Sequence, residues 1–407
     1  MGILQDDVVI IRPPEKEGDS TVLTVNCPDK TGLGCDLCRI ILFFGLTILR
    51  GDVSTDGKWC YLVFWVEGKQ KTRWSLLKKR LIAACPTCSS ASGISYYCSD
   101  SNPPKPPNVF LLKFCCHDRR GLLHDVTEVL CELELSISKV KVSTTPDGKV
   151  VDLFFITDTR ELMHTKKRKD DTIEQLMAIL KDALITIDIE LVGPEIAASS
   201  QSSFLPAAIS EDLEMPVSVQ SGTFTSDSVS VEMDNSLSPA HTLIQIMCQD
   251  HKGLLYDIMR TLKDYSIQIS YGRFTRKPRG KCEIDLFIVQ TDGKKIVDSS
   301  KQKCLSARLR SELIRPLRVA VLSRGPDSEL LVANPVELSG KGRPLVFHDI
   351  TLALKMLGTC IFSAEIGRHV IGDREWEVYR ILLDEGEGVS VPRNKIEKEV
   401  WKMLMGW

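Results

Sequence analysis

The chain has 407 residues, enough for two to four domains of ordinary size. Its 43% hydrophobic and 26% charged residues are typical of a soluble globular protein, and a net charge of −2 lacks the basic excess of a general nucleic-acid binder. No apolar run reaches the roughly 20 residues that span a bilayer, and the N-terminus does not read as a secretory signal. We therefore expect a cytoplasmic protein with no membrane or nucleic-acid partner.

The first structural unit is expected over residues 20–98. The run TVLTVNCPD alternates like a strand, the loop DKTGLGCD (29–36) follows, and a helix-like stretch comes next. LTILRGDVST and WCYLVFWVEG then flank an Asp-Gly turn, which predicts a hairpin. The run DVVII (7–11) ahead of this unit has no counterpart in the other units.

A Pro-rich spacer (99–108) leads to the second unit, residues 109–193. VFLLKFCCHD predicts a strand, DRRGLLHD (118–125) repeats the loop, and LSISKVKVSTT and VVDLFFITD form a hairpin around PDGK. A helix at 171–183 and the strand ITIDIELV complete a β-α-β-β-α-β unit, the split-βαβ order of ferredoxin-like domains. KKRK (166–169) is expected to be a solvated loop before this helix, with a nuclear import signal as the alternative.

Residues 195–240 contain seven acidic residues and no Lys, Arg or His, and we expect them to be a disordered, serine-rich linker. Its serines are either phosphorylation sites or ordinary linker residues. The third unit (241–323) repeats the loop as DHKGLLYD (250–257). Its loop Asp250 precedes Asp285 by 35 positions, and Asp118 precedes Asp152 by 34.

The fourth unit (329–407) is expected to be degenerate, because its second helix runs almost to the end of the chain and leaves no residues for a last strand. The predicted class is thus α+β, with tandem ferredoxin-like βαββαβ units and antiparallel sheets, three complete and one degenerate. Leu345 stands where the other units have glycine, so we expect this unit to be a structural wall for unit three. We also expect DVVII to cover its open sheet edge.

Linker lengths predict how the units pair. The first linker has ten residues and the second has forty-six. We therefore expect units one and two to form one body and units three and four another, with proteolysis in 195–240 releasing two fragments.

The three loops agree at an aspartate, at a glycine three residues later, and at a helix aspartate. Glycine after a strand suits positive φ or a ligand close to the backbone, and the first helical N–H groups attract an anion. An anion site beside an acidic side chain suits a free α-amino acid. The alternative is that the aspartate only caps the helix and the glycine only makes a turn. The predicted ligand-binding residues are Asp29, Gly32, Leu33, Asp118, Gly121, Leu122, Asp250, Gly253 and Leu254.

The β-α-β-β-α-β order with an Asp-x-x-Gly-Leu-Leu-like loop resembles the ACT domain, a module that binds amino acids. Four such units filling a chain resemble the plant ACT domain repeat proteins, and the repeats are also similar to the glutamine-sensing C-terminal part of bacterial uridylyltransferases. The resemblance implies that units pair edge to edge within the chain, with the ligand at the interface near this loop. It implies a regulatory amino-acid sensor acting on an unidentified protein. A scaffold whose loops bind nothing remains the alternative.

No catalytic residue, metal or cofactor is predicted. The fourteen cysteines are expected to be free thiols, although Cys35/Cys38 and Cys85/Cys88 have metal-like spacing. His117-Asp118 and His124-Asp125 mimic the metal-binding pairs of HD-type hydrolases, but the other repeats replace both histidines, so we expect these to be solvated. No Walker loop, nucleophile elbow or kinase signature is present.

Overall fold

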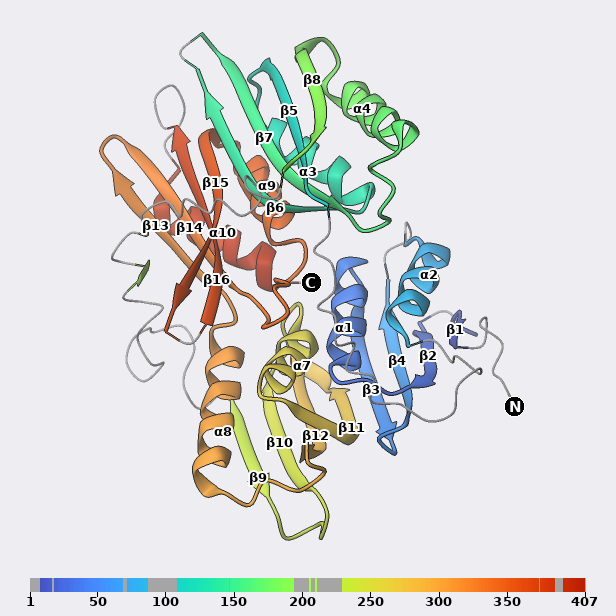
Figure 1. The fold of residues 1–407 in the computed structure, drawn as a ribbon. Helices are drawn as coiled ribbons and strands as arrows, with labels where there is room; N and C mark the ends of the chain where they lie inside the picture. Colours follow the sequence, from blue (N-terminus) through green and yellow to red (C-terminus); the bar gives the residue numbers. More distant parts are fainter. Residues whose placement is uncertain are drawn as a thin grey trace. The chain divides into compact units, whose positions relative to one another are not determined.

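The computed structural model describes residues 8–16, 18–68, 72–86, 108–145, 147–193, 205, 209–210, 229–372, 374–384 and 391–406. The chain divides into two compact bodies (Figure 1). The first body comprises Met1–Ser101 and Pro216–Pro316, and the second comprises Asn102–Met215 and Leu317–Gly406. Each body therefore combines one repeat from each half of the chain.

The first body contains repeats one and three, which have the same element order. Repeat one consists of β1 (Val9–Arg12), β2 (Thr21–Pro28), α1 (Leu33–Phe43), β3 (Thr47–Thr55), β4 (Trp59–Glu67) and α2 (Trp74–Ala84). Repeat three consists of β9 (Ser230–Asp234), β10 (Thr242–Gln249), α7 (Leu254–Asp264), β11 (Ile267–Arg276), β12 (Lys281–Gln290) and α8 (Ser299–Ile314).

The second body contains repeats two and four. Repeat two consists of β5 (Phe110–His117), α3 (Leu122–Glu132), β6 (Leu135–Thr144), β7 (Lys149–Asp158), α4 (Lys166–Leu180) and β8 (Leu184–Leu191). Repeat four consists of β13 (Arg318–Arg324), β14 (Asp327–Pro335), α9 (Val346–Leu357), β15 (Cys360–Ile371), β16 (Arg374–Asp384) and α10 (Arg393–Met405).

Each body is organised around one antiparallel sheet of eight strands. In the first body the strand order is β1-β2-β4-β3-β11-β12-β10-β9, and in the second it is β13-β14-β16-β15-β6-β7-β5-β8. The repeats join at the β3–β11 seam, where Arg273 pairs with Asp52, and at the β15–β6 seam, where Glu365 pairs with Lys141. The expected α+β class, antiparallel sheets and edge-to-edge pairing are confirmed. Each body has its own large apolar core between its sheet and its helices.

The prediction that repeats one and two share a body is wrong, because repeat one pairs with repeat three and repeat two with repeat four. A short linker limits how far the chain can reach but does not choose the partner edge. At the β3–β11 seam Arg273 Nε lies 3.3 Å from Asp52 Oδ1. Repeat four is accordingly a partner of repeat two and not a wall for repeat three.

The predicted strand order holds only for repeat two, where the edge strand β8 follows the second helix. In repeats one, three and four the edge strand comes first in sequence: β1 pairs with β2, β9 with β10, and β13 with β14. Three of the expected assignments are therefore corrected. DVVII belongs to repeat one, residues 318–324 belong to repeat four and complete its sheet, and residues 230–234 of the expected disordered linker form a strand. The same place at the edge of a sheet can be filled from either end of a repeat.

Candidate ligand-binding site

All three predicted loops start their helix from a glycine with left-handed backbone. Gly32, Gly121 and Gly253 are the N-cap residues of α1, α3 and α7, with φ of 78°, 75° and 83°. A side chain at such a position costs about 1–2 kcal/mol, which accounts for the repeated glycine. The N-cap residue of each helix is the glycine and not the loop aspartate, so the interpretation of that aspartate as the N-cap is wrong. The helix N-termini retain their preference for an anion.

The loop aspartates are held in place by the hairpin of their own repeat. In each loop the aspartate N–H donates to a carbonyl of the hairpin turn: Asp29 to Lys58 at 2.9 Å, Asp118 to Gly148 at 2.9 Å, and Asp250 to Gly280 at 2.6 Å. This hydrogen bond occurs in all three repeats and ties the loop to the hairpin, which explains why the strand, the loop and the hairpin recur together.

The three carboxyl groups nevertheless have different surroundings. Thr55 Oγ1 donates a hydrogen bond of 2.7 Å to Asp29, while Asp250 lies 3.1 Å from Nε of Arg276 in an ion pair. Burial raises the pKa of Asp118, and the charge of Asp384 raises it further. Asp29 is thus the aspartate whose neighbour is a neutral hydroxyl group.

A lysine from the paired repeat lies across two of the glycines. Carbon atoms of Lys263, on α7, lie 2.7 Å from the point where a Cβ of Gly32 would be, and its Nζ is 3.2 Å from Asp36. Lys355, on α9, lies 2.9 Å from the corresponding point of Gly121, with its Nζ 2.7 Å from Asp125. The glycine and the helix aspartate therefore act together in docking the partner repeat.

The loops border cavities of very different size. The loop of repeat one borders a cavity of about 440 Å³, within the usual range for small-molecule sites. Those next to the other predicted loops measure about 30 Å³ (Asp118, Gly121, Leu122) and 20 Å³ (Asp250, Gly253, Leu254), about the space of one water molecule. Of the three loops, the one of repeat one has room for a small organic ligand.

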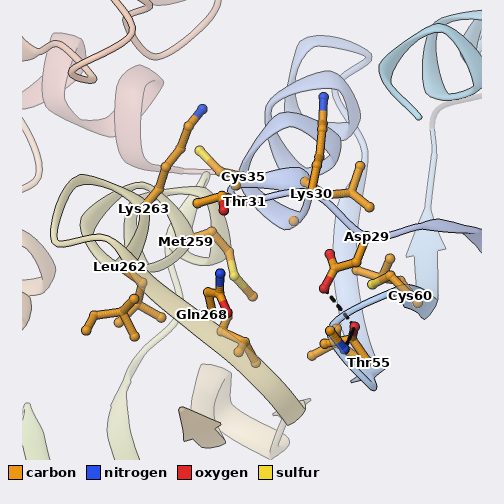
Figure 2. A pocket seen from close by; sticks show the side chains of 18 residues that line it. Asp29, Lys30, Thr31, Cys35, Thr55, Cys60, Met259, Leu262, Lys263 and Gln268 are labelled. Atoms are coloured by element: carbon orange, nitrogen blue, oxygen red, sulfur yellow. Dashed lines mark hydrogen bonds between the residues drawn. The ribbon is translucent and has the colours of Figure 1, made fainter. Parts of the chain in front are cut away.

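Two repeats build the large cavity. Repeat one supplies the loop with Asp29, Gly32 and Leu33, and repeat three supplies the end of α7 and the start of β11, including Met259 and Gln268. Figure 2 shows Asp29 and Gln268 on opposite sides of the cavity, with the chains of Lys30 and Lys263 extending away from Gln268. The carboxylate of Asp29 therefore lies at the cavity, while the ammonium groups of both lysines lie at Asp36.

Cys35 and Cys60 both line this cavity, and Cys60 is a neutral thiol. Burial raises the pKa of Cys60 to about 12, and the charge of Asp29 contributes to the shift. The twelve cysteines within the described ranges are free, and Cys35 and Cys38 lie on α1 as expected. Cys88 of the CPTC stretch lies outside the described residues. Among the described side chains, no group of His, Cys, Asp or Glu is arranged to hold a metal ion.

The prediction of two solvated histidines is wrong for His124. His117 is exposed, but His124 is 4% exposed between α3 and α9, with Nδ1 3.3 Å from Thr351 Oγ1. Its ring centroid lies 5.0 Å from that of His348. The histidine is part of the packing between repeats two and four, a role that a single repeat cannot reveal.

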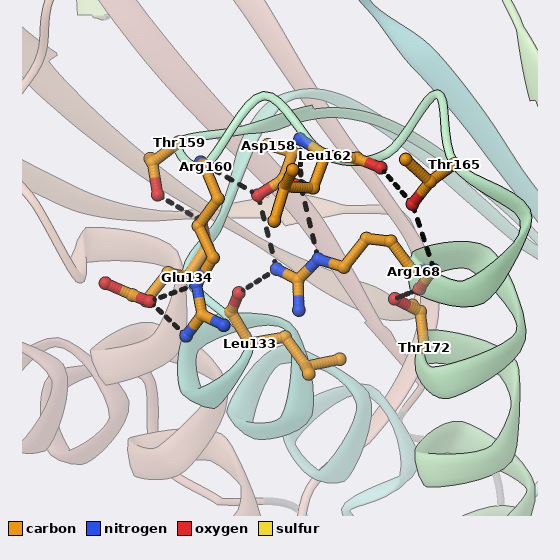
Figure 3. Close-up of polar contacts among 9 residues, drawn as sticks. All are labelled: Leu133, Glu134, Asp158, Thr159, Arg160, Leu162, Thr165, Arg168 and Thr172. Carbon is orange, nitrogen blue, oxygen red and sulfur yellow. Dashed lines mark hydrogen bonds and ion pairs between the residues drawn. The ribbon is translucent and has the colours of Figure 1, made fainter.

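The basic run KKRK forms the first turn of α4 and not a loop before it (Figure 3). Lys166 and Lys167 are exposed as expected, but Arg168 is buried. Arg168 is 7% exposed and forms an ion pair with Asp158, with Nε 3.1 Å from the carboxylate. It also donates to the carbonyl oxygen of Leu133, and its own N–H is capped by Thr165 Oγ1 at 3.3 Å. This arginine fastens α4 to the rest of repeat two.

Sequence reasoning missed the contribution of repeat three to the cavity. Met259, Lys263 and Gln268 belong to no shared motif, and their role depends on which repeat pairs with repeat one. One signal was available: Lys263 and Lys355 occupy the same position in their helices, nine residues after the first.

The part of the chain that the structure describes has no helix long and apolar enough to cross a membrane.

Family models match four successive parts of the chain. Residues 11–86 match the N-terminal model of the ACT domain-containing protein ACR10, and residues 110–173 match the ACT domain. Residues 230–327 match the ACR9-like, ACT-like domain, and residues 328–406 match the C-terminal model of the ACT domain-containing protein ACR9.

Whole-chain relatives agree with these matches. ACT domain-containing protein ACR10 of Arabidopsis thaliana is 67% identical, and ACR9 of the same plant is 54% identical, each over 100% of both chains. A bifunctional uridylyltransferase/uridylyl-removing enzyme of Gluconobacter oxydans is 28% identical over 54% of this chain and 21% of the enzyme. The chain therefore belongs to the ACT domain-containing proteins of the ACR9 and ACR10 type.

Proposed function

We propose that this protein is a regulatory sensor that binds a free α-amino acid in the cavity between repeats one and three. The observation that carries the proposal is the cavity of about 440 Å³ at an uncapped helix N-terminus beside Asp29. A zwitterion offers a carboxylate and an ammonium group a few bonds apart. The cavity presents matching groups of opposite sign at the start of α1.

Each charged group of the ligand has a partner. The α-carboxylate accepts hydrogen bonds at the N-terminus of α1, where the helix dipole favours negative charge. The α-ammonium group faces Asp29, whose position is fixed by Thr55 and by the hairpin. Gln268 lies across the cavity and adds a neutral hydrogen-bonding group.

The cavity walls suggest how binding is transmitted. A ligand that touches both repeats stabilises their association, by about 2.7 kcal/mol when its concentration is a hundred times the Kd. Occupancy therefore tightens the β3–β11 seam, and a partner protein that contacts this body can respond. Membership of the ACT family and the similarity to part of a uridylyltransferase support a regulatory, non-catalytic role.

A scaffold role is the second candidate for the remaining loops. The loops at Asp118 and Asp250 each border a space of about one water molecule. These loops serve repeat pairing, and we expect one ligand per chain.

Isothermal titration of the full chain against the twenty amino acids tests the proposal. We expect at least one amino acid to bind with a stoichiometry of one. Asp29→Ala should weaken binding by about tenfold to a hundredfold, the usual value of a hydrogen bond to a charged group. Glu67→Gln removes a carboxylate from the exposed end of β4, away from the β3–β11 seam and the cavity, and should leave the Kd unchanged. Absence of heat with every amino acid would refute the sensor function.

A further inference from the structure

Charge is confined to one part of the cavity wall. Asp29, Lys30 and Lys263 are its charged side chains. Both lysines are already engaged, since Nζ of Lys30 lies 3.0 Å and Nζ of Lys263 3.2 Å from the carboxylate of Asp36. The N–H groups at the start of α1 and the carboxylate of Asp29 therefore match the shared part of every amino acid, the α-carboxylate and the α-ammonium group.

The rest of the cavity wall therefore contacts the part in which amino acids differ, their side chains. It is formed largely by Val53 and Leu62, which are cross-strand neighbours on β3 and β4, and by Met259 and Ile269 from repeat three. Cys60 beside them is a neutral thiol, as described above. This surface offers dispersion contacts, and the polar groups beside it, among them Gln268, are neutral, so a second charge finds no ion-pair partner there.

Repeat two shows that the fold accepts another residue at the same place. Leu62 pairs with Val25, which lies four residues before the loop aspartate of repeat one. In repeat two the residue at the position of Leu62 is Asp152, which pairs with Phe114, again four residues before the loop aspartate. Asp152 is 1% exposed, so this position accepts a carboxyl group even when it is buried. Repeat one has an aliphatic side chain there, and its cavity is the large one.

We infer that the cavity selects amino acids with a sizeable apolar side chain, of the leucine, isoleucine and methionine class. The inference rests on the proposed function. The side chain lies against Val53, Leu62, Met259 and Ile269, while the α-groups occupy the start of α1. Each added methylene in such a pocket strengthens binding by about tenfold, whereas a charged side chain loses its water without gaining a partner.

Titrations with a graded set of amino acids test the inference. Affinity should rise in the order glycine, alanine, valine, leucine or methionine, and aspartate, glutamate, lysine and arginine should bind at least a hundredfold more weakly than leucine. If a charged or small polar amino acid binds best and its binding requires Asp29, the inference is overturned while the proposed function stands. If no amino acid binds, both fail.

Two variants of Val53 separate side-chain selection from general damage. Val53→Ala enlarges the cavity and should raise the phenylalanine-to-leucine affinity ratio by about tenfold. Val53→Thr keeps the volume but adds a hydroxyl group, and should weaken leucine binding by about tenfold. Val142→Ala, the same truncation in repeat two outside the proposed site, is the control and should change neither value. An unchanged ratio in Val53→Ala, with the fold intact by circular dichroism, would overturn the inference.

Discussion

Replacing Asp152 with leucine should stabilise the second body at neutral pH. The carboxyl group lies on the helix-facing side of β7, between Phe114 and Val142, and neither of its oxygen atoms has a hydrogen-bond partner. Burial raises the pKa of Asp152 well above its usual value, and the charge of Asp118 adds to this. Leucine is the residue that repeat one has at the same register, at Leu62.

The size of the gain in stability follows from the linkage between folding and protonation of Asp152. Because the folded pKa is raised, the folded state keeps a proton that the unfolded state loses above pH 3.8. Stability of the wild type therefore falls by about 1.4 kcal/mol for each pH unit between the unfolded and the folded pKa. The gain of Asp152→Leu therefore grows with pH above 3.8, and removal of the unpaired buried hydroxyl and carbonyl adds about 1–3 kcal/mol at every pH.

Denaturant unfolding between pH 4 and pH 8, followed by hydrogen exchange of the β7 amides, measures this effect. Asp152→Leu should be more stable than the wild type, with a gain that grows with pH. Asp152→Asn is the matched control: it removes the titration but keeps a polar group, so its gain should be smaller and follow the same pH dependence. A gain that is equal at pH 4 and pH 8, or a loss at pH 8, would refute the reasoning.

Three further outcomes are expected. Leu345 starts α9 with φ of 65°, so Leu345→Gly should stabilise the second body by about 1 kcal/mol in urea unfolding, and a loss would contradict the strain argument. Arg168→Met leaves Asp158 buried without its ion-pair partner and should cost about 3–5 kcal/mol, whereas a change below 1 kcal/mol would show that the pair is dispensable. Proteolytic cleavage within 195–228 should give two fragments that stay together in gel filtration, because each holds half of both bodies; their separation would disprove the interleaved pairing.

The sequence predicted the local structure of each repeat well. The strand, the glycine loop and the helix of each repeat could be predicted because each produces a pattern among residues that are close in sequence. A strand alternates apolar and polar residues, the loop needs a glycine, and a helix repeats its apolar residues at helical spacing. The position of Leu345 in the glycine place was identified in the same way, and the structure shows that leucine in the left-handed conformation.

The alignment of repeat two with repeat three by sequence similarity is wrong by one residue in β7 and β12. Matching the similar stretches DLFFITD and DLFIVQTD aligns Asp152 with Asp285. In the sheet, however, Ile284 is the residue opposite Ile246 and thus the equivalent of Asp152. A shift of one residue moves a side chain to the other face of the sheet. Asp152 is consequently buried, while Asp285 contacts Gln245 on an exposed part of the surface.

The partner of each repeat could not be predicted, because it depends on contacts between strands far apart in sequence. Nothing in β3 alone distinguishes β6 from β11 as its neighbour. The size of the three cavities depends on the same choice, since Met259 and Gln268 come from the paired repeat. Identical loop motifs therefore predicted three equal sites, whereas the three loops border spaces of very unequal size.

The alternation of the repeats has a consequence for synthesis on the ribosome. Strand β3 is complete when residue 55 has been made, but its partner β11 emerges about 220 residues later, roughly 10–40 s at ordinary translation rates. During that interval the open edges of β3 and β6 are both present in the nascent chain and close together in sequence. Their pairing with each other is the nearest available misfolded state, because both edges stay unpaired until β11 and β15 have been made.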